Sequence, residues 1–335
     1  MIMGMALGDA MGLAISANRT WPLPADADPF RGYAAGDWSA DVDQAVIAMQ
    51  AVIAAAGQSS SASLQLLTHE LTHRLHHWAA NGIAEHGDER ANGLSGSLAL
   101  VIKSPKFIDN PIETAMKIWN DGGRRLALNS SMVRAVTTAC INWDLSTSQQ
   151  SSLAAVWAEL CSLTHVDPRV IYAFTWFSQY LAALIGGMAP KNAFGAADES
   201  LQELDGMYKA SAQPTGEPAA ASAEYNMMNQ IVESARDQMI SDLKLAEVGR
   251  SAHVAKCLSV AAYTAYIIEY AAESSSRPSY EKIINHIASA GGNVTVNCAV
   301  AGAILGAHLG EPAGAKHLLH YDWLSRLVDS FIGAL

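Results

Sequence analysis

Apolar residues recur along most of the chain at the three- and four-residue spacing of a helix. The segment 62–80 shows this spacing clearly. Its apolar stripe consists of Leu64, Leu67, Leu71, Leu75 and Trp78. The segment 44–56 is apolar on all sides, which predicts a buried helix. No six residues alternate convincingly between apolar and polar, so we expect an all-α protein without a β-sheet. Further helices are predicted at 111–120, 131–142, 151–163, 168–187, 224–247, 251–273, 279–290 and 296–309.

One region interrupts this helical pattern. Residues 189–223 contain Pro190, Pro214 and Pro218 and a run of small residues. Such a composition predicts a long, mobile surface insertion, with one short helix near 197–209. The helices on both sides of it have similar compositions. We therefore expect residues 1–335 to form a single domain that carries this insertion.

Composition and net charge indicate a globular protein and argue against one class of partner. Half of the 335 residues are hydrophobic and 16% are charged, as in a globular protein. The formal net charge is -11. Binding to a nucleic-acid backbone needs clustered Lys and Arg, so we expect no nucleic-acid partner.

The cysteines and the apolar segments indicate in which cellular compartment the protein is expected. Cys140, Cys161, Cys257 and Cys298 are far apart, without C-x-x-C spacing, which predicts reduced, packed thiols. The N-terminal MIMGMALGDAMG lacks a basic region and contains Asp9, so it predicts a core helix and no signal peptide. Its glycines, and Gly302 and Gly306 four residues apart near the other end of the chain, indicate close contacts between helices. Other apolar runs fall short of the roughly 20 residues of a membrane span. We expect a cytoplasmic protein without membrane attachment.

The segment HELTH at 69–73 matches the zinc-protease pattern H-E-x-x-H. On a helix, His69 and His73 share a face and could bind zinc, with Glu70 as the base. No clear third ligand follows, and His76 and His77 extend a polar outer face. The alternative to a zinc hydrolase is an ordinary surface helix, which this pattern favours.

Several short polar segments remain. Asp9 lies in an otherwise apolar helix, and burial of an unpaired acid is costly, so it should have a partner. GDWSADVDQA at 36–45 predicts a helix start, with Ser39 as the cap and two acids in the first turn. THVDPR at 164–169, LNSSMVR at 128–134 and GGNVTVN at 291–297 also allow capped helix starts, the last with Asn293 as the cap.

Taken together and in this order, these segments resemble the motifs of the ADP-ribosylglycohydrolase family over about residues 1–310. The matching stretches are GDAMG at 8–12, WSADV at 38–42, NSSMVR at 129–134, THVDP at 164–168 and GGNVTV at 291–296. The resemblance implies a compact multi-helix orthogonal bundle. It also implies two Mg²⁺ ions in a central cleft and cleavage of the bond between ADP-ribose and its acceptor.

The departures from the family fall on the implied metal ligands. Ala40 replaces an Asp, Asn293 and Thr295 replace two more, and Val296 replaces a Thr. Mg²⁺ prefers anionic oxygen ligands, and of four carboxylates only Asp41 remains. The resemblance also implies a Glu at Ser16 in some members and a Gly at Ser130. We term the following residues the remnant site: Ser16, Ser39, Ala40, Asp41, Asn129, Ser130, Ser131, His165, Asn293, Thr295 and Val296.

Two classes of function follow from this pattern. The first is a pseudoenzyme with a binding, regulatory or structural role, without a metal cofactor, whose partner is an ADP-ribose-like or other small ligand or a protein. The second is an enzyme with altered chemistry in the same cleft, acting on an N- or O-glycosidic bond of an ADP-ribose-like or nucleoside-like ligand. Asp9, Asp41 and His165 would be its acids and bases. An ordinary hydrolase with metal ligands elsewhere is a third alternative.

Overall fold

The computed structural model describes residues 1–24, 27–29, 32–58, 63–141, 152–211, 219–236, 238–273 and 279–335. Across these residues the chain forms 14 α-helices and no strand, which confirms the predicted all-α fold. The helices are α1 (Ile2–Ser16), α2 (Ala40–Gln58), α3 (Leu64–Asn81), α4 (Gly96–Ile102), α5 (Pro111–Asp121), α6 (Met132–Thr138), α7 (Leu153–Ser162), α8 (Pro168–Ile185), α9 (Pro190–Ser211), α10 (Ala219–Arg236), α11 (Val254–Glu273), α12 (Tyr280–Ser289), α13 (Val294–Leu309) and α14 (Tyr321–Ile332).

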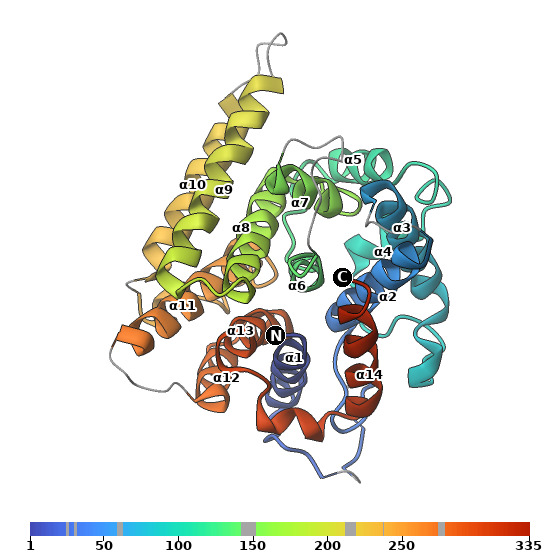
Figure 1. Cartoon of the computed structure of the whole chain (residues 1–335), viewed down its shortest axis with the longest axis vertical. Coiled ribbons are helices and arrows are strands. Elements are labelled where there is room, and N and C mark those ends of the chain that lie inside the picture. Colours follow the sequence, from blue (N-terminus) through green and yellow to red (C-terminus); the bar gives the residue numbers. More distant parts are fainter. Residues whose placement is uncertain are drawn as a thin grey trace.

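Helices α1 and α13 form a closely packed pair at the centre of the fold (Figure 1). Thirteen of the 15 residues of α1 are buried. A Cβ atom added to Gly8 would lie 2.1 Å from the carbonyl oxygen of Cys298, and one added to Gly4 would lie 2.4 Å from that of Gly302. The glycines of both helices therefore serve close backbone contact, as the sequence predicts, and α1 is the expected core helix.

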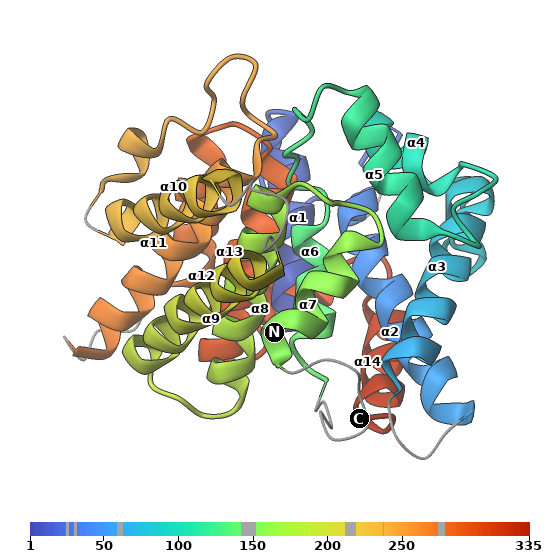
Figure 2. The same ribbon diagram turned by 90° about the horizontal axis from the view of Figure 1, so that it is seen from above.

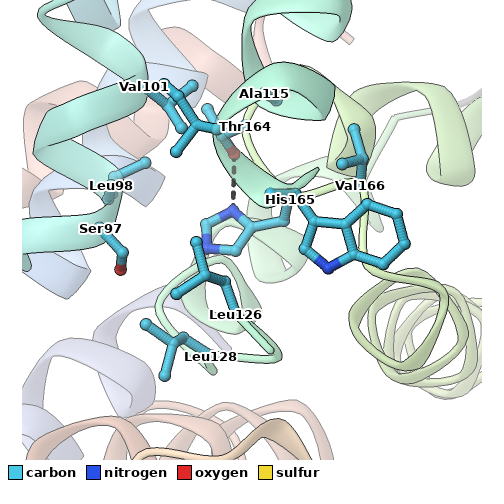
Figure 3. A pocket seen from close by; sticks show the side chains of 11 residues that line it. Ser97, Leu98, Val101, Ala115, Leu126, Leu128, Thr164, His165 and Val166 are labelled. Atoms are coloured by element: carbon cyan, nitrogen blue, oxygen red, sulfur yellow. Dashed lines mark hydrogen bonds between the residues drawn. The ribbon is translucent and has the colours of Figure 1, made fainter. Parts of the chain in front are cut away.

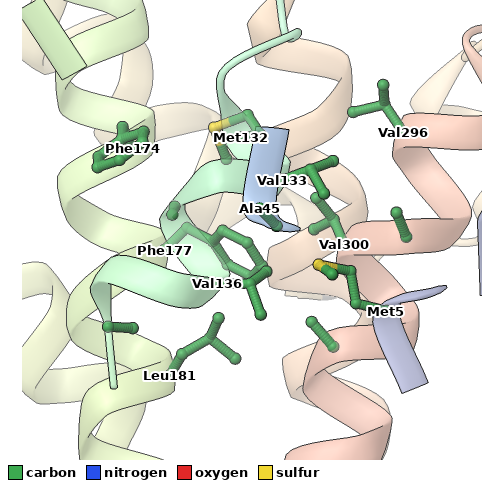
Figure 4. Close-up of a cluster of buried hydrophobic side chains, with 14 of the residues drawn as sticks. Met5, Ala45, Met132, Val133, Val136, Phe174, Phe177, Leu181, Val296 and Val300 are labelled. Atoms are coloured by element: carbon green, nitrogen blue, oxygen red, sulfur yellow. The ribbon is translucent and has the colours of Figure 1, made fainter. Parts of the chain in front are cut away.

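The short helix α6 lies inside the protein, among α1, α2, α8 and α13. All seven of its residues are buried. Figure 4 shows the side chains of Met132, Val133 and Val136 among those of Phe177 on α8 and Val300 on α13. Residues 129–131, which precede α6, are thereby fixed next to the N-terminal end of α2.

In the region 189–223, the predicted short helix near 197–209 is longer than expected. Pro190–Ser211 form one 22-residue helix, and Pro190 is its first residue, where proline is tolerated. Phe194, Leu201 and Leu204 are buried. Together α9 and α10 form a helical hairpin beside α8 and α11, and it extends away from the remaining helices (Figure 1). Residues 212–218 lie outside the described residues.

Other differences concern helix ends. The segment 224–247 is not one helix, because α10 ends at Arg236 and a 3₁₀ turn covers Ile240–Leu243. Helices α4 and α14 were not predicted. All four cysteines are free, and Cys161, Cys257 and Cys298 are buried. In the described part, α2 alone is long and apolar enough to cross a membrane, but 67% of its apolar window is buried inside the protein, as in a core helix.

Candidate functional site

The start of α2 and the middle of α1 meet at a pair of carboxyl groups. Asp9 is fully buried and accepts two hydrogen bonds from Ser39, one from the backbone N–H at 2.7 Å and one from the hydroxyl at 2.8 Å. The same hydroxyl lies 3.5 Å from a carboxyl oxygen of Asp41 and accepts from the Asp41 N–H at 3.3 Å. Asp9 has the partner that its burial requires, and Ser39 caps α2 as predicted.

Burial favours the protonated form of both carboxyl groups. Burial raises the pKa of Asp9 to about 7, against the two hydrogen bonds from Ser39, which lower it. Burial, together with the neighbouring charge of Asp9, raises the pKa of Asp41 to about 8, against a hydrogen bond from Ser39 that lowers it.

The N-terminal end of α13 supplies the second half of the site. The Asn293 side-chain amide donates to the side-chain oxygen Oδ1 of Asn129 at 2.9 Å, and the Thr295 hydroxyl donates to Oδ1 of Asn293 at 3.3 Å. Asn293 occupies the N-cap position, but its side chain makes no capping hydrogen bond, so that prediction is wrong. Val296 is fully buried among apolar side chains (Figure 4). Asn293 and Thr295 are therefore hydrogen-bonded to each other, and Asn293 is also bonded to Asn129 in the loop before α6.

Helix α1 joins the two halves. A Cβ atom on Gly12 would lie 2.9 Å from the carbonyl oxygen of Val294, so the backbones of the α1 and α13 motifs touch beside the site. Burial raises the pKa of the Cys298 thiol, and the charge of Asp9 raises it further. Asp9 therefore faces α13 as well as α2.

His165 forms a separate buried network. Its Nε2 lies 3.0 Å from the Ser130 hydroxyl, and its Nδ1 lies 2.8 Å from the Thr164 hydroxyl. Burial, together with the charge of Arg134, lowers the pKa of His165 to about 3, so the ring is neutral. Figure 3 shows the ring pointing towards Leu126 and Leu128 in a small pocket.

That pocket holds about 20 Å³, room for roughly one water molecule. It adjoins a hollow of about 1090 Å³ over α4 and α5, and Ser97, Ile118 and Leu126 line both. The Ser97 hydroxyl is buried without a partner. A route from the surface towards His165 therefore runs between α4 and α5, and it narrows at these three side chains.

Sequence reasoning missed the part of Gln44 in this network. The side-chain amide of Gln44 donates to the Ser130 carbonyl at 2.8 Å, and its oxygen lies 3.4 Å from a guanidinium nitrogen of Arg134. Arg134 is fully buried and donates to the Thr164 hydroxyl at 2.8 Å. The sequence contained one indication of this role, because the polar residue Gln44 begins the largely apolar segment 44–56.

The remaining predicted residues fall outside these contacts. Ala40 begins α2 and is buried. Ser16 ends α1, where its hydroxyl donates to the Leu13 carbonyl at 2.8 Å. Ser131 is buried before α6.

Two other acids near the remnant site in sequence have partners of their own. Asp43 accepts from the indole N–H groups of Trp38 and Trp78. Asp167 caps α8 by accepting from the Arg169 N–H at 3.0 Å, as THVDPR predicts.

The HELTH segment lies on the outside of α3. His69 and His73 are exposed, with ring centroids 4.3 Å apart. Glu70 accepts from Arg74 at 3.1 Å and from Gln58 at 3.0 Å, so these bonds occupy the base that a zinc protease would need. Within the described ranges, no three or more His, Cys, Asp or Glu side chains are grouped so that they could hold a metal ion.

Comparison with known proteins identifies the fold and the family. The family model described as ADP-ribosylglycohydrolase matches residues 1–335. A solved structure titled "ADP-ribosylglycohydrolase-related protein complex" superposes with a TM-score of 0.59 at 14% identity, covering 99% of this chain and 95% of that chain. No curated protein matches the chain. The chain belongs to the ADP-ribosylglycohydrolase family.

Proposed function

We propose that this protein is a catalytically inactive ADP-ribosylglycohydrolase-like protein that binds a ligand without the two-Mg²⁺ site. One observation carries the proposal. Asn293 and Thr295, at positions where the resemblance implies metal-binding acids, direct their side chains into hydrogen bonds with Asn129 and with each other. Bonds of this kind turn metal-ligand positions into a neutral hydrogen-bonded network.

Electrostatics supports the same conclusion. Two adjacent dications repel each other strongly and need several carboxylates to offset that repulsion. Of the implied ligands only Asp41 is an acid. The residues present therefore do not fit two Mg²⁺ ions.

The site nevertheless stays polar, which favours a binding role over a filled core. The Nδ2 of Asn129 is buried without a partner, and so are both polar side-chain atoms of Asn297, one turn into α13. Buried polar groups are nearly always paired with protein, water or ligand. A small polar ligand such as ADP-ribose or a related nucleoside could supply these partners, and a protein partner is the other candidate.

The test compares the wild type with a variant in which the implied metal ligands are restored. Its substitutions are Ala40→Asp, Asn293→Asp, Thr295→Asp and Val296→Thr. Without metal the variant should melt lower than the wild type, because its acids converge with Asp41. Mg²⁺ should then raise its melting temperature, since an ion that binds only the folded state adds about 2.7 kcal/mol at a hundredfold excess over Kd. Equal responses of both proteins to Mg²⁺ would refute the proposal.

A second candidate function is metal-independent catalysis, and the Ser130–His165 contact favours it. A hydroxyl 3.0 Å from an imidazole nitrogen has the spacing of a nucleophile and its base. Asp9 or Asp41, protonated near neutral pH, would then serve as the acid. The test is hydrolysis of an ADP-ribosylated substrate in EDTA. Activity that disappears in Ser130→Ala would establish this function, and its absence in the wild type would exclude it for that substrate.

A further inference from the structure

We infer that His69 and His73, on the exposed face of α3, form a binding site for a divalent late transition-metal ion such as Zn²⁺. The site is independent of the remnant site and of the function proposed above. Imidazole nitrogen is a preferred ligand of Zn²⁺, Ni²⁺ and Cu²⁺, whereas Mg²⁺ prefers oxygen. Two histidines four residues apart on a helix lie on one face, the arrangement with which helices bind zinc.

The geometry of the pair supports this assignment. The two rings lie 4.3 Å apart between centroids and are tilted by 53°. Both side chains are exposed, so they can rotate to direct one nitrogen each at a common ion. The other ionisable group of the motif, Glu70, is bonded to Arg74 and Gln58. The pair is therefore suited to hold an ion rather than to use it as a protease does.

A hollow next to the pair provides a second, independent observation. His69 lines a cavity of about 370 Å³ next to α3 and α5. Figure 2 shows these two helices on the same side of the protein. Asp109, Glu113 and Glu159 line the same cavity, and negative charge there favours a cation. The Thr72 hydroxyl also lines it and is buried without a partner.

The two histidines would fill only two of the coordination positions of the ion. In the described part of the chain no third His, Cys, Asp or Glu completes the pair into a metal-holding group. Water molecules or an added anion must therefore take the remaining positions, and the cavity beside His69 has room for them. The Thr72 hydroxyl could accept from such a water. Binding should be reversible, unlike that of a closed structural zinc site.

The decisive experiment is calorimetric titration of the full chain with ZnCl₂. We expect one Zn²⁺ per chain. His77 continues the four-residue spacing, so His69→Ala leaves a second pair, whereas His73→Ala leaves two histidines eight residues, or about 12 Å, apart. Since joining two ligands raises affinity by on the order of 10²–10⁴-fold, His73→Ala should weaken binding by at least about a hundredfold.

Two further variants locate the site. His77→Ala should bind Zn²⁺ as the wild type does, because the observed ring contact joins His69 and His73. His286→Ala, which removes an exposed histidine from α12, is the matched control and should also leave binding unchanged. All these positions are exposed and alanine favours helix, so the variants should fold. Absence of saturable binding, or equal binding by wild type and His73→Ala, would overturn the inference.

Discussion

Replacement of Asp9 by Asn should make the protein more stable above neutral pH and change its pH dependence. Asn can keep both contacts with Ser39, because its oxygen accepts from the backbone N–H and its amide donates to the hydroxyl. What the substitution removes is the ability to carry a buried negative charge. The prediction therefore isolates the charge of Asp9 from its hydrogen bonds.

The magnitude follows from the pKa of Asp9. Burial raises it from 3.8 to about 7 in the folded protein. Between these values the folded state holds a proton that the unfolded chain has released, so stability falls as pH rises. Each pH unit of this interval costs about 1.4 kcal/mol, which gives a loss on the order of 4 kcal/mol by pH 7.5. Below about pH 4 both states are protonated and the loss vanishes.

The assay is urea unfolding of both proteins between pH 4 and pH 8. Other groups titrate in this range, so the quantity to follow is the difference in unfolding free energy between Asp9→Asn and wild type. It should grow with pH up to about 7.5 and then level off. Asp322→Asn, at an exposed position of α14, is the control for the loss of one acid. A difference that does not change with pH would refute the reasoning.

Three further predictions concern stability and are measured by the same unfolding assay. Gly8→Ala should destabilise the protein by about 1–3 kcal/mol or more, because its Cβ would lie 2.1 Å from the Cys298 carbonyl oxygen. Gly57→Ala is the control and should leave the stability unchanged, because nothing lies within 4 Å of the added Cβ. Leu201→Ala should cost about 2–5 kcal/mol if α9 packs as described, and an unchanged midpoint would contradict that packing. Ser39→Ala should cost about 1–3 kcal/mol, and more at pH 8 than at pH 5, because its hydroxyl bond favours ionised Asp9; an equal loss at both values would exclude that cause.

Much of the fold was readable from local pattern. Helical spacing predicted an all-α chain, and the glycines of the N-terminal segment predicted the close contact that α1 makes with α13. The helix near 197–209 was predicted too short for a physical reason. Pro190 occupies the first position of α9, where its missing N–H has no cost, and small residues hide the stripe that contains Phe194, Leu201 and Leu204.

The site was readable only in part. The need of a buried acid for a partner predicted that Asp9 is bonded, but only the structure identified Ser39 as that partner. Gln44 and Arg134 are 90 residues apart in sequence. No periodicity or propensity encodes such a contact, because it depends on how α2 and α6 pack. Sequence pattern therefore gave the chemistry of single positions, and packing determined their partners.

The carboxyl group of Asp9 is the feature that packing alone does not explain. An amide would satisfy Ser39 equally well and would avoid the cost of a buried charge. A group that lowers stability at neutral pH is explained when it serves a ligand, since functional sites hold groups whose pKa values burial has shifted. Stability and binding of Asp9→Asn must therefore be measured together. A variant that gains stability and loses affinity for ADP-ribose would assign Asp9 to ligand recognition. A variant that gains stability and keeps its affinity for ADP-ribose would mean that Asp9 has no part in binding ADP-ribose.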